Sequence, residues 1–329
     1  MSHFSLIVIG DDYENQLEPF WELDLSEEEL KNDPRSIFEI KVPAAEVPER
    51  AKRYIEEVEE NIQRWQKQIM ELDPTTEKHR DAHIELDRQK QLLTDYQYLY
   101  EQGGYGKIIT DWDGYDPDEY GNYGRYRNPN AKWDWYQMGG RWAKFFKLKD
   151  GTPGLVGPNG TIVTNGWADQ ARVGDIDWEG MMEEAEREAN QEYDKFEEVT
   201  KGLTPPERWL DFLEGCGGIN NIDHARVAYG GHSWIRALRQ AHLDPFLGDA
   251  QDYYKIDKGG RGAFVRCKTQ GVIAPFAILK DGEWYEKGEM GWWGIVSDEK
   301  AEDKWIDEAC TLLMSLPEDT LLTLVDCHI

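Results

Sequence analysis

The stretch HFSLIVIG, residues 3–10, sets the fold class, because it brings five apolar side chains ahead of a glycine. A short apolar run closed by Gly10 and the acidic pair Asp11-Asp12 is typical of a buried strand followed by a loop. The chain ends on a similar pattern, residues 321–325, which leads into Asp326, Cys327 and His328. We expect the first and last strands to lie together, with His3 and His328 as near neighbours.

Short strands and helices follow one another between these two strands. Ser26 and Glu29 form a capping box, which starts a short acidic helix ending near Asn32. Asn159-Gly160, Asn165-Gly166 and Asp281-Gly282 indicate tight turns within antiparallel sheets. Residues 178–200 and 298–316 are predicted as helices; residues 142–148, 263–267, 272–279, 283–285 and 292–296 are predicted as strands, and residues 103–127 as a long loop. This order predicts an α+β fold of antiparallel sheets with covering helices.

Residues 47–102 carry the most regular pattern in the chain. The seven apolar positions Ala51, Ile55, Val58, Ile62, Trp65, Ile69 and Leu72 are spaced 4-3-4-3-4-3, as in a coiled-coil seam. Asp73 and Pro74 break the pattern, and a similar spacing continues from Ala82 to Tyr100. We expect an inserted antiparallel helical hairpin, ~40 Å long at ~1.5 Å per residue. It would build an oligomer or fold back on its own domain.

The same patterns divide the chain into five parts. Residues 1–46 and 261–329 are expected to form the α+β body, with residues 47–102 as the hairpin arm. Residues 103–176 form an aromatic, glycine-rich region with a small sheet, and residues 177–260 a helical acidic region.

The formal net charge of -28 is the strongest fact of composition. It excludes a broad basic face for direct nucleic-acid binding. Residues 11–35 and 177–200 each hold ten acidic and two basic residues, so they carry more than half of the net charge. These stretches are solvated faces, or surfaces that imitate the phosphate rows of DNA and occupy a basic host protein.

The four cysteines lie far apart and form no CxxC pair, so neither a zinc ribbon nor a disulfide framework is indicated. No stretch approaches the ~20 apolar residues of a membrane span, and the N-terminus lacks a secretory leader. We expect a reduced, cytoplasmic protein without membrane association.

Residues 128–142, NPNAKWDWYQMGGRW, form the densest candidate for recognition. Aromatic faces, an arginine and two glycines offer stacking, planar donors and close backbone approach, although a core corner would use the same residues. A second polar and aromatic cluster, residues 167–177, is expected to meet it. The full set of candidate binding residues is Trp133, Asp134, Trp135, Arg141, Trp142, Asp169, Gln170, Arg172, His232, Trp292, Trp293 and His328.

No catalytic residue can be assigned from the sequence. Cys327 and His328 are adjacent on a strand and therefore point to opposite faces. Asp134, Asp169, Asp175 and Asp326 are candidates for a general acid or base. Two places could hold a metal ion. His79 and His83 lie one helical turn apart but lack a third ligand nearby. Residues 111–119 resemble a calcium loop but do not have the EF-hand spacing. We expect no metal and no cofactor.

Four segments, NPNAKWDWYQMGGRW, ADQAR at 168–172, GEMGWWG at 288–294 and LPEDTLLTLVDCHI at 316–329, resemble signatures of an uncharacterised protein family of bacteriophages and mobile elements. Its members also open with a segment like MSHFSLIVIG. The resemblance implies a phage or prophage setting, where accessory proteins act on host machinery or defence, and it brings no activity with it.

Three functions remain open. We favour a non-enzymatic, oligomeric phage protein that binds and inhibits a host factor, such as a nucleic-acid-binding defence complex. The alternative is a protein that binds or hydrolyses a small nucleotide signal, with tryptophans stacking a base and Arg141 and Arg172 holding phosphate. A virion structural or assembly protein is the third.

Overall fold

The chain separates into two compact units in a computed structural model that describes every residue except 1, 244, 246–248 and 292–293. The sheet unit comprises the residues up to Glu18 together with Trp133–Ile329. The inserted unit is Pro19–Lys132. A short 3-10 helix, η1 (Glu18–Phe20), spans the boundary between them.

An eight-stranded sheet is the centre of the sheet unit. Its strand order is β12-β11-β1-β15-β10-β7-β8, and β5 also pairs with β15. All pairs are antiparallel except β1 with β11. The strands are β1 (His3–Ile9), β5 (Trp135–Met138), β7 (Gly154–Val156), β8 (Thr161–Val163), β10 (Gln170–Arg172), β11 (Ala277–Lys280), β12 (Glu283–Glu286) and β15 (Leu321–His328). Two small ladders, β6 (Phe146–Lys147) with β9 (Trp167–Ala168) and β13 (Glu289–Met290) with β14 (Val296–Ser297), complete the unit.

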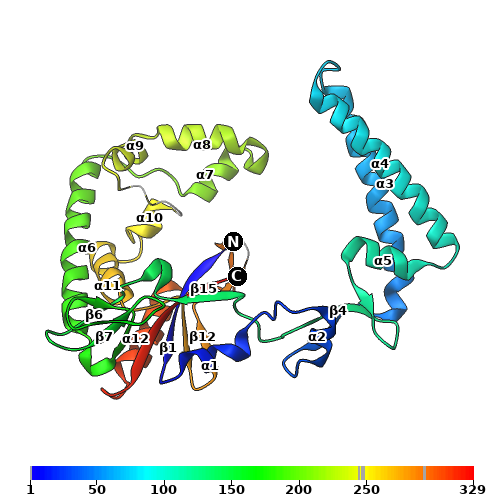
Figure 1. The fold of residues 1–329 in the computed structure, drawn as a ribbon. Helices are drawn as coiled ribbons and strands as arrows, with labels where there is room; N and C mark the ends of the chain where they lie inside the picture. The colour runs from blue at the N-terminus through cyan, green and yellow to red at the C-terminus, as the bar shows by residue number, and fades with distance from the viewer. Residues whose placement is uncertain (1, 244, 246–248, 292–293) are drawn as a thin grey trace. The chain divides into compact units, whose positions relative to one another are not determined.

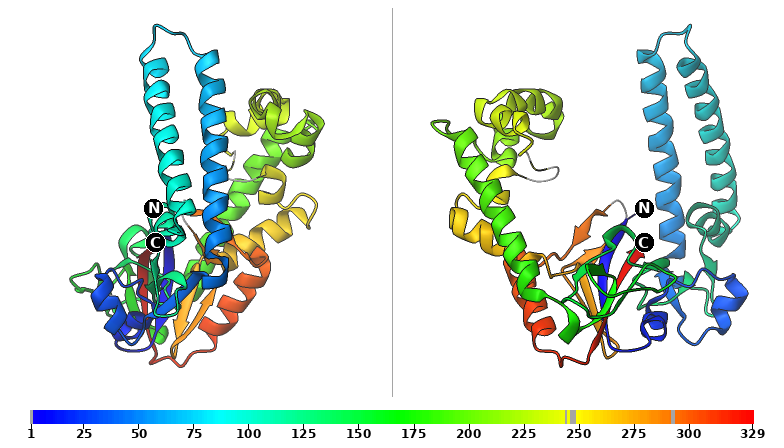
Figure 2. Two further views of the ribbon diagram at one scale, coloured as in Figure 1. Left: turned by 90° about the vertical axis from the view of Figure 1, so that its right-hand side faces the viewer. Right: turned by 60° about the vertical axis from the view of Figure 1, so that its left-hand side comes forward.

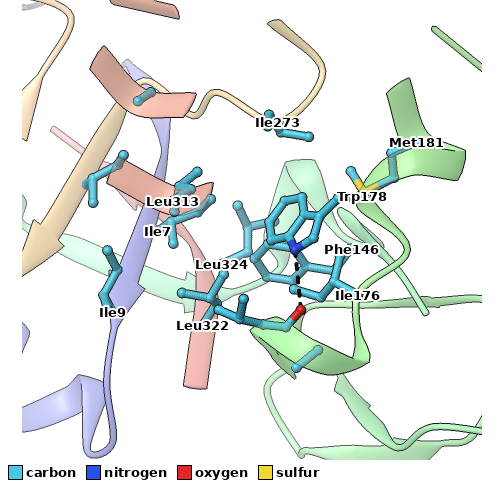
Figure 3. Close-up of a cluster of buried hydrophobic side chains, with 14 of the residues drawn as sticks. Ile7, Ile9, Phe146, Ile176, Trp178, Met181, Ile273, Leu313, Leu322 and Leu324 are labelled. Carbon is cyan, nitrogen blue, oxygen red and sulfur yellow. Dashed lines mark hydrogen bonds between the residues drawn. The ribbon is translucent and has the colours of Figure 1, made fainter. Parts of the chain in front are cut away.

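The first and last strands lie side by side at the centre of this sheet (Figure 1). Both are buried on both faces, which explains their nearly continuous apolar sequences. Ile7 and Ile9 lie on one face with Leu324, where Trp178 and Leu313 from two helices cover them (Figure 3). Trp178 also donates its indole hydrogen to the Val173 carbonyl at 3.3 Å. The expected pairing of the two terminal strands is therefore confirmed.

The helices of the sheet unit form a second core. The long helix α6 contributes Tyr193 and Phe196, which pack with Trp234, Tyr254 and Phe264, and α11 lies alongside α6 (Figure 2). The helices are α1 (Tyr13–Leu17), α6 (Trp178–Thr200), α7 (Trp209–Gly215), α8 (Ile222–Gly231), α9 (Ser233–Gln240), α10 (Ala250–Tyr253), α11 (Gly260–Gly271) and α12 (Glu302–Met314), with 3-10 turns η3 (Gly140–Trp142), η4 (Val173–Asp175) and η5 (Gly218–Asn221).

The inserted unit combines two helices of 25 residues each with a three-stranded sheet. Helices α3 (Val47–Glu71) and α4 (Glu77–Glu101) lie side by side (Figures 1 and 2). Ala51 and Val58 of the predicted seam are buried, whereas Ile55 and Ile62 are partly buried. The remaining elements are α2 (Glu27–Asn32), β2 (Ile37–Val42), η2 (Ala44–Glu46), α5 (Tyr105–Asp113), β3 (Asp116–Pro117) and β4 (Tyr123–Arg127).

The predicted α+β class is confirmed, and several local predictions hold with it. Ser26 accepts from the Glu29 amide, and the Glu29 carboxylate accepts from the Ser26 amide, so the capping box is formed. Asp281 and Gly282 both have positive φ, 52° and 79°, as the turn between β11 and β12 requires. Helix α6 spans the predicted residues 178–200.

Several predictions of secondary structure differ from the structure. Residues 263–267 are part of helix α11, because Phe264 is held in the helical core by Tyr193 and Tyr254, at centroid distances of 5.4 and 5.3 Å. The predicted loop over 103–127 contains α5, whose Ile108 and Ile109 are fully buried, as well as β3 and β4. The predicted strands over 142–148 and 272–279 shorten to β6 and β11, and the one over 292–296 begins outside the described residues. A short apolar run does not distinguish a strand from a helix until tertiary packing is known.

Candidate active site

The paired ends of β1 and β15 place two histidines side by side. Ser2 and Ile329 exchange both backbone hydrogen bonds, at 3.1 Å each. The next pair along such an antiparallel ladder has no mutual hydrogen bonds and brings its side chains closest together. This pair is His3 and His328, whose ring centroids lie 4.8 Å apart with the ring planes at 74°. The expected proximity of the two histidines is confirmed.

Each imidazole is held by its own carboxylate. His3 Nδ1 lies 2.8 Å from Asp326 Oδ1, and His328 Nδ1 lies 2.6 Å from Asp134 Oδ1. A carboxylate at Nδ1 holds the hydrogen of a neutral imidazole on that atom, so Nε2 keeps its lone pair for another partner. Among the described residues, no hydrogen bond occupies either Nε2 atom. The site therefore presents two oriented imidazoles that are ready to accept or donate a proton.

Asp326 is only 2% exposed and is held from both sides. One oxygen faces His3, and the other accepts from the backbone amide of Arg141 at 3.0 Å. Gly140 makes this approach possible: its φ is 54°, and a Cβ atom there would overlap the Asp326 carboxylate. The close backbone approach expected of the glycine pair thus serves an aspartate of the chain itself.

Asp169 is fully buried and holds the loop of residues 139–144. Its carboxylate accepts from the backbone amides of Lys144 and Gly157, the latter at 2.8 Å. A Cβ atom on Gly139, whose φ is 76°, would overlap this carboxylate. The segments 128–142 and 167–177 meet here, as expected from the sequence. Asp169 is a positioning residue, because it holds the loop whose Arg141 amide binds Asp326.

The two neighbouring tryptophans of this segment have different environments. Trp135, on β5 opposite His328, is 49% exposed, and its ring lies edge-on to His3 at 6.4 Å between centroids. Trp133 is 7% exposed, donates its indole hydrogen to the Leu17 carbonyl at 3.1 Å and packs edge-on against Tyr136. Trp135 can therefore stack on a ligand beside the imidazoles, whereas Trp133 is a core residue.

The other predicted site residues are not gathered at the imidazoles. Gln170 lies opposite Thr323 and bonds to it at 2.7 Å, on the opposite face of the sheet, since Thr323 is five residues from His328. Arg172 lies opposite Leu321 on that same face and donates to the Asp319 carbonyl. Trp142 packs against the core, and Trp292 and Trp293 lie outside the described residues.

His232 acts as a helix cap. Its side chain accepts from the Trp234 amide at 3.3 Å, at the start of α9. The sequence suggested either an anion site or a helix entry with Ser233 as the cap. The helix entry is right, but the capping residue is His232, and its Nδ1 is already engaged.

Cys327 is excluded as a nucleophile. It lies fully buried opposite Phe4 and Tyr136, on the other face of the sheet from His328. Burial raises the pKa of its thiol well above the usual value, so the thiolate is disfavoured. The predicted separation of Cys327 from His328 holds.

The proposed binding residues omitted His3 and Asp326, which complete the arrangement. Asp326 is a candidate acid or base from the sequence, and strand alternation also assigns it to this site, because it lies two residues before His328 and so on the same face. His3 was recognised as a neighbour of His328, and its role depends on Asp326, 323 positions away.

In the described part of the chain, no group of three or more His, Cys, Asp or Glu residues could hold a metal ion. Asp118 of the suspected calcium loop accepts from the Asn122 side chain and from the backbone amides of Asn122 and Tyr120. These hydrogen bonds, the side-chain one first, hold its pKa below the usual value and explain it as a turn former.

A cavity of about 590 Å³ lies among α6, α11 and α12 and shares no residue with the two His-Asp pairs. Two of its lysines are engaged by other lining residues: Lys255 pairs with Glu302 at 2.5 Å, and Lys268 donates to the Tyr253 hydroxyl at 2.7 Å. The imidazoles, whose Nε2 atoms no described group engages, remain the stronger candidate.

No protein-family model, curated protein or solved structure matches this chain. Within the residues that the structure describes, no helix combines the length and apolar character needed to cross a membrane. The site geometry therefore carries the functional argument.

Proposed function

We propose that this protein is an enzyme that cleaves a phosphate ester of a small nucleotide by general acid–base catalysis. His3 and His328 are its proton-transferring residues. The observation that carries this proposal is the pair of facing imidazoles, 4.8 Å apart and each held at Nδ1 by a carboxylate. Asp326 and Asp134 act as positioning residues.

Two imidazoles held in this way can perform opposite steps of one reaction. Breaking a phosphate ester requires a base that removes a proton from the attacking hydroxyl and an acid that gives one to the leaving oxygen. A neutral imidazole accepts at Nε2, and a protonated one donates from the same atom. The pair therefore matches the demands of phosphoester cleavage.

Nearby thiol and hydroxyl side chains are engaged elsewhere. Cys327 is buried on the other face. Ser2 Oγ donates to the Gly291 carbonyl at 2.8 Å and accepts from the Gly294 amide at 2.7 Å, and Ser5 Oγ accepts from the Phe276 amide at 3.0 Å. Because the two imidazoles are assigned to proton transfer, we take the attacking group to be water or a hydroxyl of the substrate.

Trp135 and Arg141 support a nucleotide as the substrate. The half-exposed indole of Trp135 offers a stacking face for a base. Arg141 is exposed and its backbone amide binds Asp326, so we expect its guanidinium to reach a phosphate at the rim of the site. The net charge of -28 repels a long polyanion, which favours a small nucleotide.

The test is turnover of mononucleotides and of linear and cyclic dinucleotides by the purified protein, measured by chromatography. We expect product with the parent chain and a loss of at least ~100-fold in rate in both His3→Asn and His328→Asn. Thermal unfolding of the variants shows whether they fold.

A matched control exists in the inserted unit. His79 and His83 also lie close together, 4.7 Å between centroids, but among the described residues neither ring bonds to a carboxylate. The double variant His79→Asn/His83→Asn should keep full activity. Absence of turnover across the whole panel, or equal turnover in His3→Asn, contradicts the proposed function.

A second candidate, an inhibitor that binds a basic host protein, is favoured by the acidic helix α6. Glu183, Glu186 and Glu188 are exposed on it. Other acidic residues of α6 are matched within the chain, since Arg261 pairs with Asp194 and Glu197 at 2.5 and 2.7 Å. Only part of the helix remains for a partner.

Charge neutralisation tests this candidate. Replacing Glu183, Glu184, Glu186 and Glu188 with glutamine should abolish salt-sensitive binding to a basic host protein. The same fourfold change at the exposed residues Glu56, Glu57, Glu59 and Glu60 of α3 should leave binding intact. Equal effects of the two sets would show that net charge, and no specific surface, drives association.

A further inference from the structure

We propose that the attacking group is the 2′-hydroxyl of the substrate. The substrate is then a small ribonucleotide with a 3′,5′-phosphodiester bond, linear or cyclic, and the product carries a 2′,3′-cyclic phosphate. This inference rests on the proposed function and adds the identity of the nucleophile and the sugar.

The first argument concerns the size of the available catalytic effects. One positioned acid or base contributes ~10²–10⁴ in rate, so two contribute ~10⁴–10⁸. Enzymes typically accelerate their reactions by ~10⁶–10¹⁷-fold, so two imidazoles alone reach only the lower part of this range. A nucleophile within the substrate supplies an effective concentration of ~10⁵–10⁸ M. The same two imidazoles therefore accelerate attack by an internal hydroxyl far more than attack by water.

The second argument concerns what could hold a water molecule. Asp326 uses one oxygen for His3 and the other for the Arg141 amide. Asp169 is fully buried, and its two oxygens accept backbone amides of Lys144 and Gly157. The two buried carboxylates beside the site are thus committed to the protein, and Asp134, whose side chain is 37% exposed, has one oxygen at His328 and keeps only the other for a water molecule. A hydroxyl that arrives already attached to the substrate needs no such holder.

The reaction balances with the two imidazoles alone. One Nε2 removes the proton of the 2′-hydroxyl, and the 2′-oxygen forms a bond to phosphorus. The bond from phosphorus to the 5′-oxygen breaks, and that oxygen takes a proton from the Nε2 of the other ring. The rings have then exchanged protonation states, and proton exchange with solvent restores them. His3 and His328 each have a carboxylate at Nδ1 and an Nε2 that no described group engages, so either ring can remove the first proton.

The experiment compares substrates that differ only at the 2′ position. Adenylyl-3′,5′-adenosine and cyclic di-adenosine monophosphate are incubated with the full chain, beside their 2′-deoxy and 2′-O-methyl counterparts. We expect cleavage of the ribonucleotides and no detectable cleavage of the counterparts, a difference of at least ~10⁵-fold. Mass spectrometry should show a product lighter by one water than the hydrolysis product.

The outcomes separate this inference from the proposed function. Cleavage of the deoxy or O-methyl compounds at a comparable rate, lost in His3→Asn, overturns the 2′-hydroxyl and leaves acid–base cleavage standing. If the first turnover already gives the hydrolysed product without a cyclic phosphate, the 2′-hydroxyl is likewise overturned and acid–base cleavage stands. Turnover of no compound overturns both. Cleavage of the linear or of the cyclic ribonucleotide alone supports the inference and identifies the form that the site accepts.

Discussion

Asp134 and His328 lie 194 positions apart in the chain, yet the Asp134 carboxylate is 2.6 Å from His328 Nδ1. Asp134 immediately precedes β5, and the antiparallel register of β5 with β15 sets Trp135 opposite His328. The ladder that builds the sheet therefore also orients the imidazole. This coupling of sheet register to side-chain chemistry leads to the first prediction.

Asp134→Asn should reduce activity without unfolding the protein. The Asp134 side chain is 37% exposed, so its ion pair contributes at most ~1 kcal/mol to stability. An amide at this position no longer supports a protonated imidazole, and we expect a fall of ~100-fold in kcat with little change in KM. The measurement is steady-state kinetics with a thermal unfolding curve. A large loss of thermal stability with normal kcat would assign Asp134 a structural role.

Gly140→Ala should destabilise the sheet unit strongly. Its φ of 54° disfavours a side chain, and a Cβ atom would overlap the buried Asp326 carboxylate. We expect the free energy of unfolding to fall by ~3 kcal/mol or more, measured by urea titration with tryptophan fluorescence.

Gly151→Ala is the matched control for that variant. Gly151 has a φ of 78°, and a Cβ atom added there would meet nothing within 4 Å. Only backbone strain should remain there, at a cost of ~1 kcal/mol. Equal losses in the two variants would mean that the overlap with Asp326 is relieved easily.

Cys327 should resist alkylation in the folded protein. Burial raises the pKa of its thiol well above the usual value, which disfavours the reactive thiolate, and the sulfur is inaccessible. Cys216 is partly exposed and should react before Cys327. Peptide mass spectrometry after brief iodoacetamide treatment, with and without urea, measures both. Rapid labelling of Cys327 without urea would contradict the buried position.

Tyr54 should make the inserted unit sensitive to alkali. Its hydroxyl donates to Asp113 and accepts from Arg50, and burial, followed by the Asp113 hydrogen bond, raises its pKa to about 12 from 10.0. Between these values the folded state keeps a proton that the unfolded state has lost. The free energy of unfolding therefore falls as pH rises from 10 to 12, by at most ~2.7 kcal/mol.

Tyr54→Phe should flatten this dependence, because the ionisable group is gone. The exposed Tyr98 provides the control, and Tyr98→Phe should keep the slope. The measurement is urea unfolding at pH 9 and pH 11.5. If the free energy of unfolding of Tyr54→Phe falls as steeply with pH as that of the parent chain, other tyrosines cause the loss of stability in alkali.

Local signals in the sequence were sufficient for much of the fold. The capping box of Ser26, the Asp281-Gly282 turn and the extent of α6 depend on residues within one or two turns of each other, and the structure has them as predicted. The apolar runs at the two ends also predicted adjacent strands, since each run had to bury both of its faces.

The α+β class, the terminal strands and the closeness of His3 to His328 could all be predicted from the order of the residues. The folded chain was needed to show that Trp135 is exposed and Trp133 buried, that residues 263–267 are helical, and that Asp326 and Asp134 hold the two imidazoles. The two groups of features differ in how far apart in the sequence the interacting residues lie. Alternation and capping act over a few residues, whereas burial and hydrogen bonding join side chains that the fold brings together from distant parts of the chain.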